Sequence, residues 1–247
     1  MRRAGPTPTT RTPSASLALS WGERFRKMDR DWSGVLRRQE EALLSDWRRA
    51  MSDMQSQHDR LVASGRWVTG PSDFLAIIDL ARHENTHSRV LKWLLTPTAR
   101  HGLGCSLAER LVEHCAGKLP SQPLSVREVT FSEWRHGREA DLVVWGETFT
   151  LIIENKVDAG EQPDQADDLY ANFKSETAPL FLFLTPDGRE PHTANNPNAQ
   201  RAFRCISWPS VRRMIEAALA ESPSASSSAT GVSVVENYLR TLKEQFG

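Results

Sequence analysis

Three charged residues, Asp141, Glu154 and Lys156, lie in two segments that are otherwise rich in apolar and β-prone residues. Burying an unpaired charge is costly, so charges in such a setting are expected to be paired or to bind a metal. Two neighbouring carboxylates repel each other and raise one pKa, and a divalent cation with oxygen ligands resolves that conflict. A lysine beside them can stabilise negative charge on an attacking water or a phosphate, so this set indicates phosphodiester cleavage.

The two segments predict an antiparallel β-hairpin that brings the carboxylates together. Residues 138–145 and 148–157 are β-prone runs, and the short connection between them contains a glycine. A turn centred at 146–147 places Asp141 close to Glu154 in either of two registers. Because side chains alternate along a strand, a lysine two residues after Glu154 shares its face.

The order of Asp141, a hairpin and Glu154-Asn155-Lys156 resembles the D…(D/E)xK signature of the PD-(D/E)xK nuclease superfamily. The continuation, ENKVDAGEQPDQADDLY, is similar to a mostly bacterial branch in which an ENK strand end leads into a helix with Gln and Tyr. The resemblance implies that Asp141 and Glu154 bind metal, with the backbone carbonyl of Asn155 as a third ligand. It also implies that Lys156 orients the water or stabilises the transition state.

Two further site residues follow from the same resemblance. Residues 83–104, HENTHSRVLKWLLTPTARHGLG, are similar to the branch's E-x-x-H-S helix, with Thr96 where an acidic residue is usual. Glu84 would then face the metal site, through a water or a second ion, although an acid in a first helical turn also favours the helix dipole without catalysis. Gln165 is expected to face the site or to be an exposed helix residue. Tyr170 lies about 140° from Gln165 around the axis of the same helix, so a role for Tyr170 at the site is in doubt.

Other polar residues near these motifs leave two interpretations open. Glu139 shares a face with Asp141, either as an extra ligand or as a partner of Arg138, and we favour the ion pair. His87 lines a substrate groove or closes the start of a helix, and His101 lies in a loop before glycines. No cysteine or further histidine has the spacing of zinc ligands, so we predict no zinc site.

Length and composition set the limits for these interpretations. A chain of 247 residues fits one large domain or one domain with extensions. Its formal net charge of zero means that no global basic field attracts nucleic acid, although a local basic groove would suffice. Three cysteines without paired spacing favour a reducing compartment, and we expect a cytoplasmic protein. No apolar run approaches about 18 residues, so no membrane span is predicted.

The composition divides the chain into five segments. A tail rich in Pro, Ser, Thr and Arg is expected to be disordered, and a Ser-rich stretch near the other end predicts a flexible linker. The helical extension carries an apolar stripe that would pack on the body of the protein or on a second copy. The segments are a tail (1–21), a helical extension (22–70), a nuclease-like domain (71–220), a linker (221–230) and a C-terminal helix (231–247).

Periodicity within the nuclease-like domain predicts an α/β fold with a mixed central β-sheet flanked by helices. By the resemblance, this is a restriction-endonuclease-like core, preceded here by the helical extension. Besides the hairpin, we expect helices at 74–81, from 84 up to Pro97, at 103–118, from 162 or 164 to 175 and at 208–220, with strands at 124–131, 179–185 and 202–207.

The leading functional hypothesis is a Mg²⁺-dependent nuclease, with Mn²⁺ as a substitute. The resemblance implies that it cuts DNA rather than RNA, in bacterial defence or DNA processing. A second hypothesis is a catalytically silent nucleic-acid-binding or scaffold module on the same fold. A third is an unrelated metal phosphoesterase that acts on nucleotides. We expect nucleic acid as partner, no membrane, and a homodimer or accessory protein as an option. No base-reading motif is evident, so the sequence does not indicate a target.

Overall fold

A computed structural model describes residues 20–222 and 228–247 of the chain. These residues form eight helices and five strands, and the chain divides into two compact units, residues 1–69 and 70–247. All of the predicted disordered tail except residues 20–21 lies outside the described residues, as do residues 223–227 of the predicted linker. Across the described residues, no helix combines the length and the apolar character that crossing a bilayer would require.

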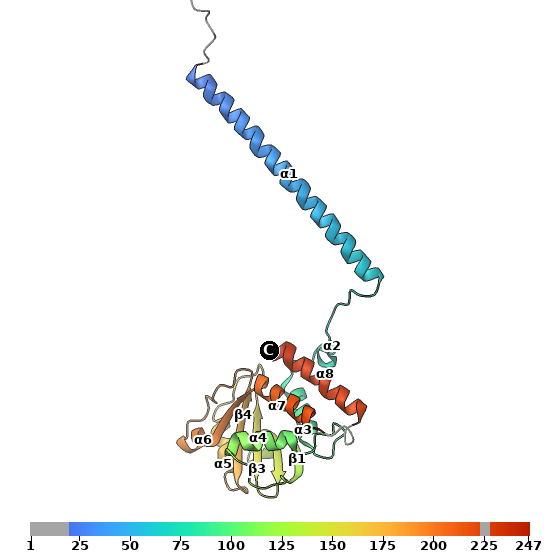
Figure 1. Ribbon diagram of the computed structural model, residues 1–247. Helices are drawn as coiled ribbons and strands as arrows, with labels where there is room; N and C mark the ends of the chain where they lie inside the picture. Colours follow the sequence, from blue (N-terminus) through green and yellow to red (C-terminus); the bar gives the residue numbers. More distant parts are fainter. Residues whose placement is uncertain (1–19, 223–227) are drawn as a thin grey trace, which may run out of the picture. The chain divides into compact units, whose positions relative to one another are not determined.

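Within the described residues of the first unit lies one long α-helix, α1 (Trp21–Ala63), where the sequence predicted one helix or two shorter ones (Figure 1). Ser20 caps its start: the hydroxyl accepts from the backbone N–H of Glu23, whose carboxylate accepts from the N–H of Ser20. This reciprocal capping box satisfies two N–H groups that the first turn leaves free. None of the 43 residues of α1 is buried.

The second unit contains a five-stranded mixed sheet in the order β1-β2-β3-β4-β5. The first three strands form an antiparallel meander, and the last two continue the sheet in parallel. This arrangement confirms the predicted mixed-sheet α/β fold. The strands are β1 (Val126–Arg135), β2 (Arg138–Gly146), β3 (Thr150–Asn155), β4 (Pro179–Thr185) and β5 (Phe203–Ser207).

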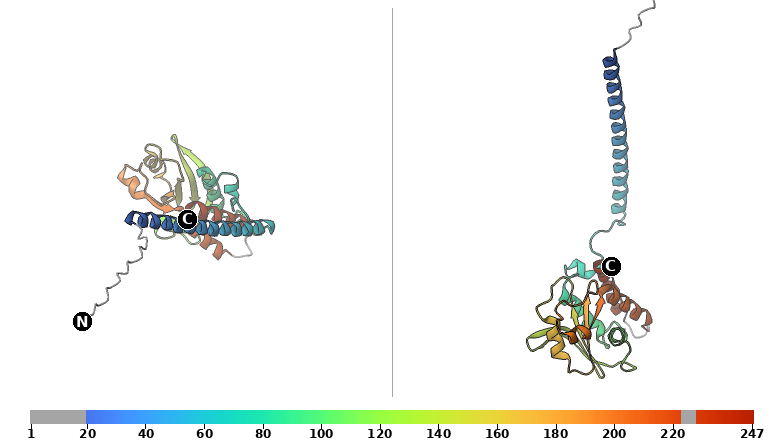
Figure 2. Two further views of the ribbon diagram at one scale, coloured as in Figure 1. Left: turned by 90° about the horizontal axis from the view of Figure 1, so that it is seen from above. Right: turned by 90° about the vertical axis from the view of Figure 1, so that its left-hand side faces the viewer.

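Helices cover both faces of the sheet and create two hydrophobic clusters (Figures 1 and 2). The larger cluster joins one face to α3, α4, α7 and α8, and the smaller one joins the other face to α5 and α6. Alternation along β3 divides its side chains between them: Leu151 and Ile153 enter the larger cluster and Ile152 the smaller one. The helices of this unit are α2 (Phe74–Ile77), α3 (Glu84–Leu95), α4 (Ser106–Ala116), α5 (Gln165–Phe173), α6 (Pro197–Ala202), α7 (Trp208–Glu221) and α8 (Ala229–Phe246).

Two hairpins connect the first three strands, and the sequence predicted one of them. The chain reverses between β1 and β2 at His136 and Gly137, whose φ angles of 47° and 79° suit a type I′ turn. The predicted first strand, 124–131, therefore extends further, to Arg135. In the second hairpin, Gly146 donates its N–H to the carbonyl of Phe149, so the turn is centred one residue later than expected. A Cβ at Gly146 would lie 2.1 Å from the Phe149 ring, which explains the glycine.

Several predicted helices are shorter in the structure. The helix expected at 74–81 ends at Ile77, because Asp79 adopts a left-handed φ of 57°. The helices expected at 103–118 and at 162–175 occupy Ser106–Ala116 and Gln165–Phe173. Helix α6 (Pro197–Ala202) occupies a segment for which the sequence predicted no helix.

Strands β1 and β5 form the two edges of the sheet. The register of β1 against β2 shifts between Val126 and Glu128, and Ser132 has a left-handed φ of 61°. Arg127 and Glu128 are exposed on this strand, whereas β5 has only five residues. Both edges are therefore irregular, charged or short.

His87 joins α3 to α8 in the interior of the second unit, so it does not line a groove. Its Nε2–H donates to the carbonyl of Ala81 at 2.9 Å, and its Nδ1 accepts from the Tyr238 hydroxyl at 2.9 Å. Burial lowers the pKa of His87, with the Ala81 carbonyl opposing this effect, so the ring is neutral in the folded state. His101 is also structural, since it accepts from the N–H of Leu103.

We predict that His87→Leu destabilises the protein by about 1–3 kcal/mol at pH 7.5, because it leaves a buried hydroxyl and a carbonyl without their partner. A depressed pKa in the folded state gives stability above the unfolded pKa of about 6.5 that is lost as pH falls. The destabilisation should therefore be smaller at pH 5 than at pH 7.5. Urea unfolding followed by circular dichroism measures both values, with His192→Leu at an exposed position as the control. An equal loss at both pH values would contradict the role of the neutral ring.

Candidate active site

Asp141 and Glu154 lie opposite each other on neighbouring strands. The last paired residues of the hairpin are Leu142 and Ile153, and one further step in this register places Asp141 across from Glu154. This is one of the two registers that the sequence allowed. Asp141 accepts the backbone N–H of Asn155 on its Oδ2 at 2.7 Å, so its carboxylate is fixed to the end of β3.

The two oxygens of Glu154 have different surroundings. Oε1 accepts from Lys156 Nζ at 2.8 Å and from Gln165 Nε2 at 2.5 Å. Oε2 is buried and has no hydrogen-bond partner among the described residues. Glu154 is 2% exposed, so its carboxylate is withdrawn from bulk solvent. An unpartnered buried carboxylate oxygen is costly unless a ligand satisfies it.

Asn155 faces the opposite side of the strand from Glu154 and Lys156. Its Nδ2 donates to the Ser88 hydroxyl at 3.1 Å and to the carbonyl of Glu84 at 3.2 Å. The side chain therefore connects the end of β3 to the first turn of α3. The predicted use of its backbone carbonyl as a metal ligand stays a prediction.

Glu84 begins α3 and holds the chain that follows β3. Its Oε1 accepts from the N–H groups of Val157 at 2.7 Å and Ala159 at 3.0 Å. The side chain also lines the same pocket as Asp141 and Glu154. Neither interpretation of Glu84 from the sequence anticipated this backbone contact, and its role toward a metal stays a prediction.

Gln165 starts α5 and reaches Glu154 from the other helix layer. Its Oε1 accepts from the N–H of Gln162 at 3.1 Å, which orients the amide so that Nε2 faces Glu154. The residue is 7% exposed, so it is not the exposed helix residue that was the alternative. Tyr170 packs against Phe181, with ring centroids 5.5 Å apart, and does not line the pocket.

Arg138 positions the segment that leads into α5. The sequence did not reveal this role of Arg138. Its guanidinium donates to the Gln162 side chain at 2.7 Å and to the Pro163 carbonyl at 2.9 Å, and it pairs with Asp168 at 2.5 Å. The expected pairing of Arg138 with Glu139 is therefore wrong, because the partner lies 30 residues away in sequence. Glu139 instead lines the pocket beside Asp141.

A second ion pair fixes the same segment to the loop after β4. Glu161 accepts from Arg189 at 2.5 Å, from the N–H groups of His192 and Thr193, and from the Thr193 hydroxyl. Burial raises the pKa of Glu161, but these donors outweigh it and lower the value to about 2. Sequence reasoning missed this cluster, since no local pattern connects the two loops.

The pocket around these groups has a volume of about 220 Å³. Trp134 lies near the end of β1, next to the turn into β2, and lines this pocket. It is 63% exposed, so the indole at the rim of the pocket is accessible to solvent. The sequence analysis overlooked Trp134, although a tryptophan two residues before a His-Gly turn is a usable signal. The lining residues are Glu84, Trp134, Gly137, Arg138, Glu139, Asp141, Glu154, Lys156, Ala159, Gly160, Gln162 and Gln165.

Electrostatics shows that this pocket has an excess of negative charge. Burial raises the pKa of Asp141 to about 6, Glu84 and Glu139 add to the shift, and the Asn155 N–H and Lys156 oppose it. Burial, with Asp141 next, raises the pKa of Glu154 well above its usual value. Burial lowers the pKa of Lys156, but the Glu154 carboxylate outweighs this and keeps the ammonium charged. The carboxylates therefore require protons or an added cation.

The donor set fits a hard divalent cation with few protein ligands. Asp141 and Glu154 provide two opposed carboxylates, and Glu154 Oε2 accepts no hydrogen bond from the described residues. In the described parts of the chain, no group of three or more His, Cys, Asp or Glu side chains could hold a metal. Mg²⁺ is compatible with this, because it usually keeps several waters and binds through one or two carboxylates.

Comparison with known proteins gives one finding. Residues 72–240 match the family model described as the PD-(D/E)XK nuclease superfamily. Neither the curated proteins nor the solved structures contain a match. The matched range contains the whole sheet and every residue of the pocket, and it excludes α1.

We predict that Glu154→Gln weakens Mn²⁺ binding at least tenfold while the protein stays folded. The amide keeps the shape of the side chain but removes the negative charge that attracts a cation, and burial already raises the pKa of Glu154, which favours a neutral group at this position. Isothermal titration calorimetry measures the affinity, with Glu147→Gln in the exposed hairpin turn as the control. Unchanged Mn²⁺ affinity in Glu154→Gln would exclude Glu154 as a ligand.

Proposed function

Because the chain belongs to the PD-(D/E)XK nuclease superfamily, we propose that it hydrolyses phosphodiester bonds of nucleic acid with a divalent cation. One observation carries this proposal: Glu154, whose Oε2 has no hydrogen-bond partner among the described residues, lines a pocket together with Asp141 and Lys156.

Mg²⁺ is the proposed cofactor, with Mn²⁺ as a substitute. Asp141 and Glu154 would hold it, together with the backbone carbonyl of Asn155. When bound, such a cation lowers the pKa of water and offsets negative charge that develops on a phosphate. Glu84 is the proposed additional contact, through a water or a second ion.

Lys156 supplies the positive charge of the chain itself. Its side chain is 10% exposed, and Nζ lies 2.8 Å from Glu154, so the ammonium is held in one position before substrate arrives. A preorganised donor of this kind stabilises charge on a phosphate or orients an attacking water. Gln165 holds Glu154 through a hydrogen bond to Oε1, which leaves Oε2 without this contact. Gln165 is therefore a positioning residue in this proposal.

The proposed substrate is DNA rather than RNA, and the proposed setting is bacterial defence or DNA processing in the cytoplasm. The family supports a nucleic-acid substrate, and the resemblance of residues 83–104 and 154–170 supports the bacterial setting. The exposed indole of Trp134 at the rim provides a surface on which a base can stack. Stacking tolerates any base, which agrees with the lack of a sequence-reading motif.

We predict metal-dependent cleavage of DNA that Lys156→Ala reduces about 100-fold or more, since it removes one preorganised charge. Linear, circular and single-stranded DNA and RNA are incubated with Mg²⁺, Mn²⁺ or chelator, and Lys174→Ala at an exposed position of the α5 end is the control. Full activity of Lys156→Ala would contradict the proposed role. Nucleic-acid binding without cleavage in any condition would instead support the catalytically silent module.

We predict that Trp134→Ala raises KM for single-stranded DNA roughly tenfold with little change in kcat, because a base loses its stacking surface. Trp134→Phe keeps an aromatic face and should restore most of the affinity. Steady-state cleavage of a labelled oligonucleotide separates the two constants. Equal KM values for wild type and Trp134→Ala would show that the indole does not contact the substrate.

A further inference from the structure

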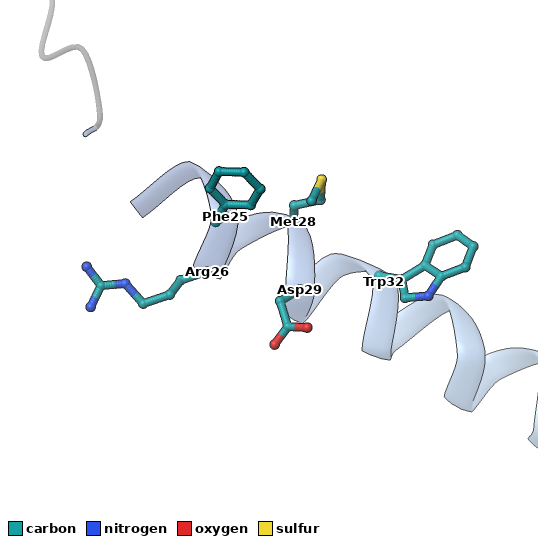
Figure 3. Close-up of a pocket in the computed structure, with 5 residues that line it drawn as sticks. All are labelled: Phe25, Arg26, Met28, Asp29 and Trp32. Atoms are coloured by element: carbon teal, nitrogen blue, oxygen red, sulfur yellow. The ribbon is translucent and has the colours of Figure 1, made fainter. Parts of the chain in front are cut away.

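Helix α1 carries large apolar side chains that are exposed among the described residues of its own unit. They are between 44% and 75% exposed, which is unusual for so many tryptophan, phenylalanine, leucine and methionine residues in one element. In Figure 3, Phe25, Met28 and Trp32 project along one side of the helix, while Arg26 and Asp29 project away from it. The exposed set is Trp21, Phe25, Met28, Trp32, Leu36, Leu43, Leu44, Trp47, Met51 and Met54.

Eight of these ten side chains follow a repeat of 11 residues, and Leu44 and Met51 lie outside it. Eleven residues complete three turns at about 3.67 residues per turn, so the stripe runs almost straight along the helix. A second helix can then remain in contact with it over the whole length. The three repeating positions are Trp21, Trp32, Leu43 and Met54; Phe25, Leu36, Trp47 and His58; and Met28, Gln39, Ala50 and Leu61.

The charges on α1 divide the helix into two halves of opposite sign. Residues 21–38 contain six basic and three acidic side chains, whereas residues 39–63 contain three basic and five acidic ones. A parallel pair of such helices would place like halves together. An antiparallel pair places each basic half beside an acidic half, which is the favourable arrangement.

We propose that α1 pairs antiparallel with α1 of a second copy of this chain, with residue i opposite residue 79 − i. This register places apolar residues opposite each other through the centre of the helix. It also places the basic half of each helix alongside the acidic half of the other. The apolar pairs are Phe25–Met54, Met28–Met51, Trp32–Trp47 and Leu36–Leu43.

A second copy is the occupant that these observations favour. The same stripe supplies both apolar surfaces, and the same charge asymmetry supplies both complementary halves. Such self-complementarity is the property of an interface with twofold symmetry. The family match excludes α1, so this pairing is separate from the proposed catalysis.

The oligomeric state of the full chain tests the use of the stripe. Light scattering after size-exclusion chromatography should give twice the chain mass of 27.8 kDa for the wild type. Trp47→Glu should give a monomer, whereas Ser45→Glu, with the same added charge on the opposite side of α1, should remain a dimer. Thermal unfolding of both variants shows whether the second unit stays folded. A monomeric wild type, or a dimer that persists in Trp32→Glu and Trp47→Glu, would overturn the proposal.

Disulfide crosslinking tests the orientation. A mixture of Phe25→Cys and Met54→Cys should form a disulfide-linked heterodimer, while Phe25→Cys alone should not crosslink to itself. The wild type, oxidised in parallel, reports any crosslinks through Cys105, Cys115 or Cys205. Self-crosslinking of Phe25→Cys would indicate a parallel pair and would overturn the antiparallel register. A monomer that binds DNA through the basic half would assign the helix to nucleic acid instead.

Discussion

The buried carboxylate of Glu154 is the group on which the arrangement of the second unit depends. One of its oxygens requires both the lysine two residues later and a glutamine at the start of α5. Asn155, which lies between Glu154 and Lys156 in the sequence, points to the other face of the sheet and contacts the start of α3 through Ser88. Three consecutive residues at one strand end thus connect both helix layers to the site. A shift of any of these elements would leave a buried polar group unsatisfied, so the fold and the site constrain each other.

Sequence patterns revealed the parts of this unit that depend on local chemistry. Strand β4 was predicted with its observed bounds, because an apolar run lies between Pro179 and the turn after Thr185. The charges of the site were recognisable because they interrupt apolar strands. The β1–β2 hairpin was missed because β1 is an edge strand with polar residues on much of its length. Strand alternation predicts that the Asn155 side chain points to the face opposite Glu154, but the resemblance assigned a role only to its backbone carbonyl.

Long-range contacts were not predictable in the same way. Arg138 finds its partner on α5, and Glu161 finds Arg189 and Thr193 in a loop after another strand. Each contact depends on how the strands and helices are ordered in space, which local periodicity does not encode. Helix α1 is the opposite case, since its length and its stripe are visible in the sequence, but a single chain does not display what the stripe contacts. If two copies pair as proposed, the Ala63 residues would lie about 70 Å apart along the pair.

The irregular edge of the sheet has a consequence for the behaviour of the protein in concentrated solution. A regular edge strand offers unpaired N–H and C=O groups to any other strand and so promotes open-ended sheet extension. In β1, the register shift after Val126, the left-handed Ser132 and the exposed charges of Arg127 and Glu128 interrupt that template. At the other edge, β5 offers only five residues. The sheet therefore resists fibril-like growth, and a helical surface can hold two chains together without that hazard.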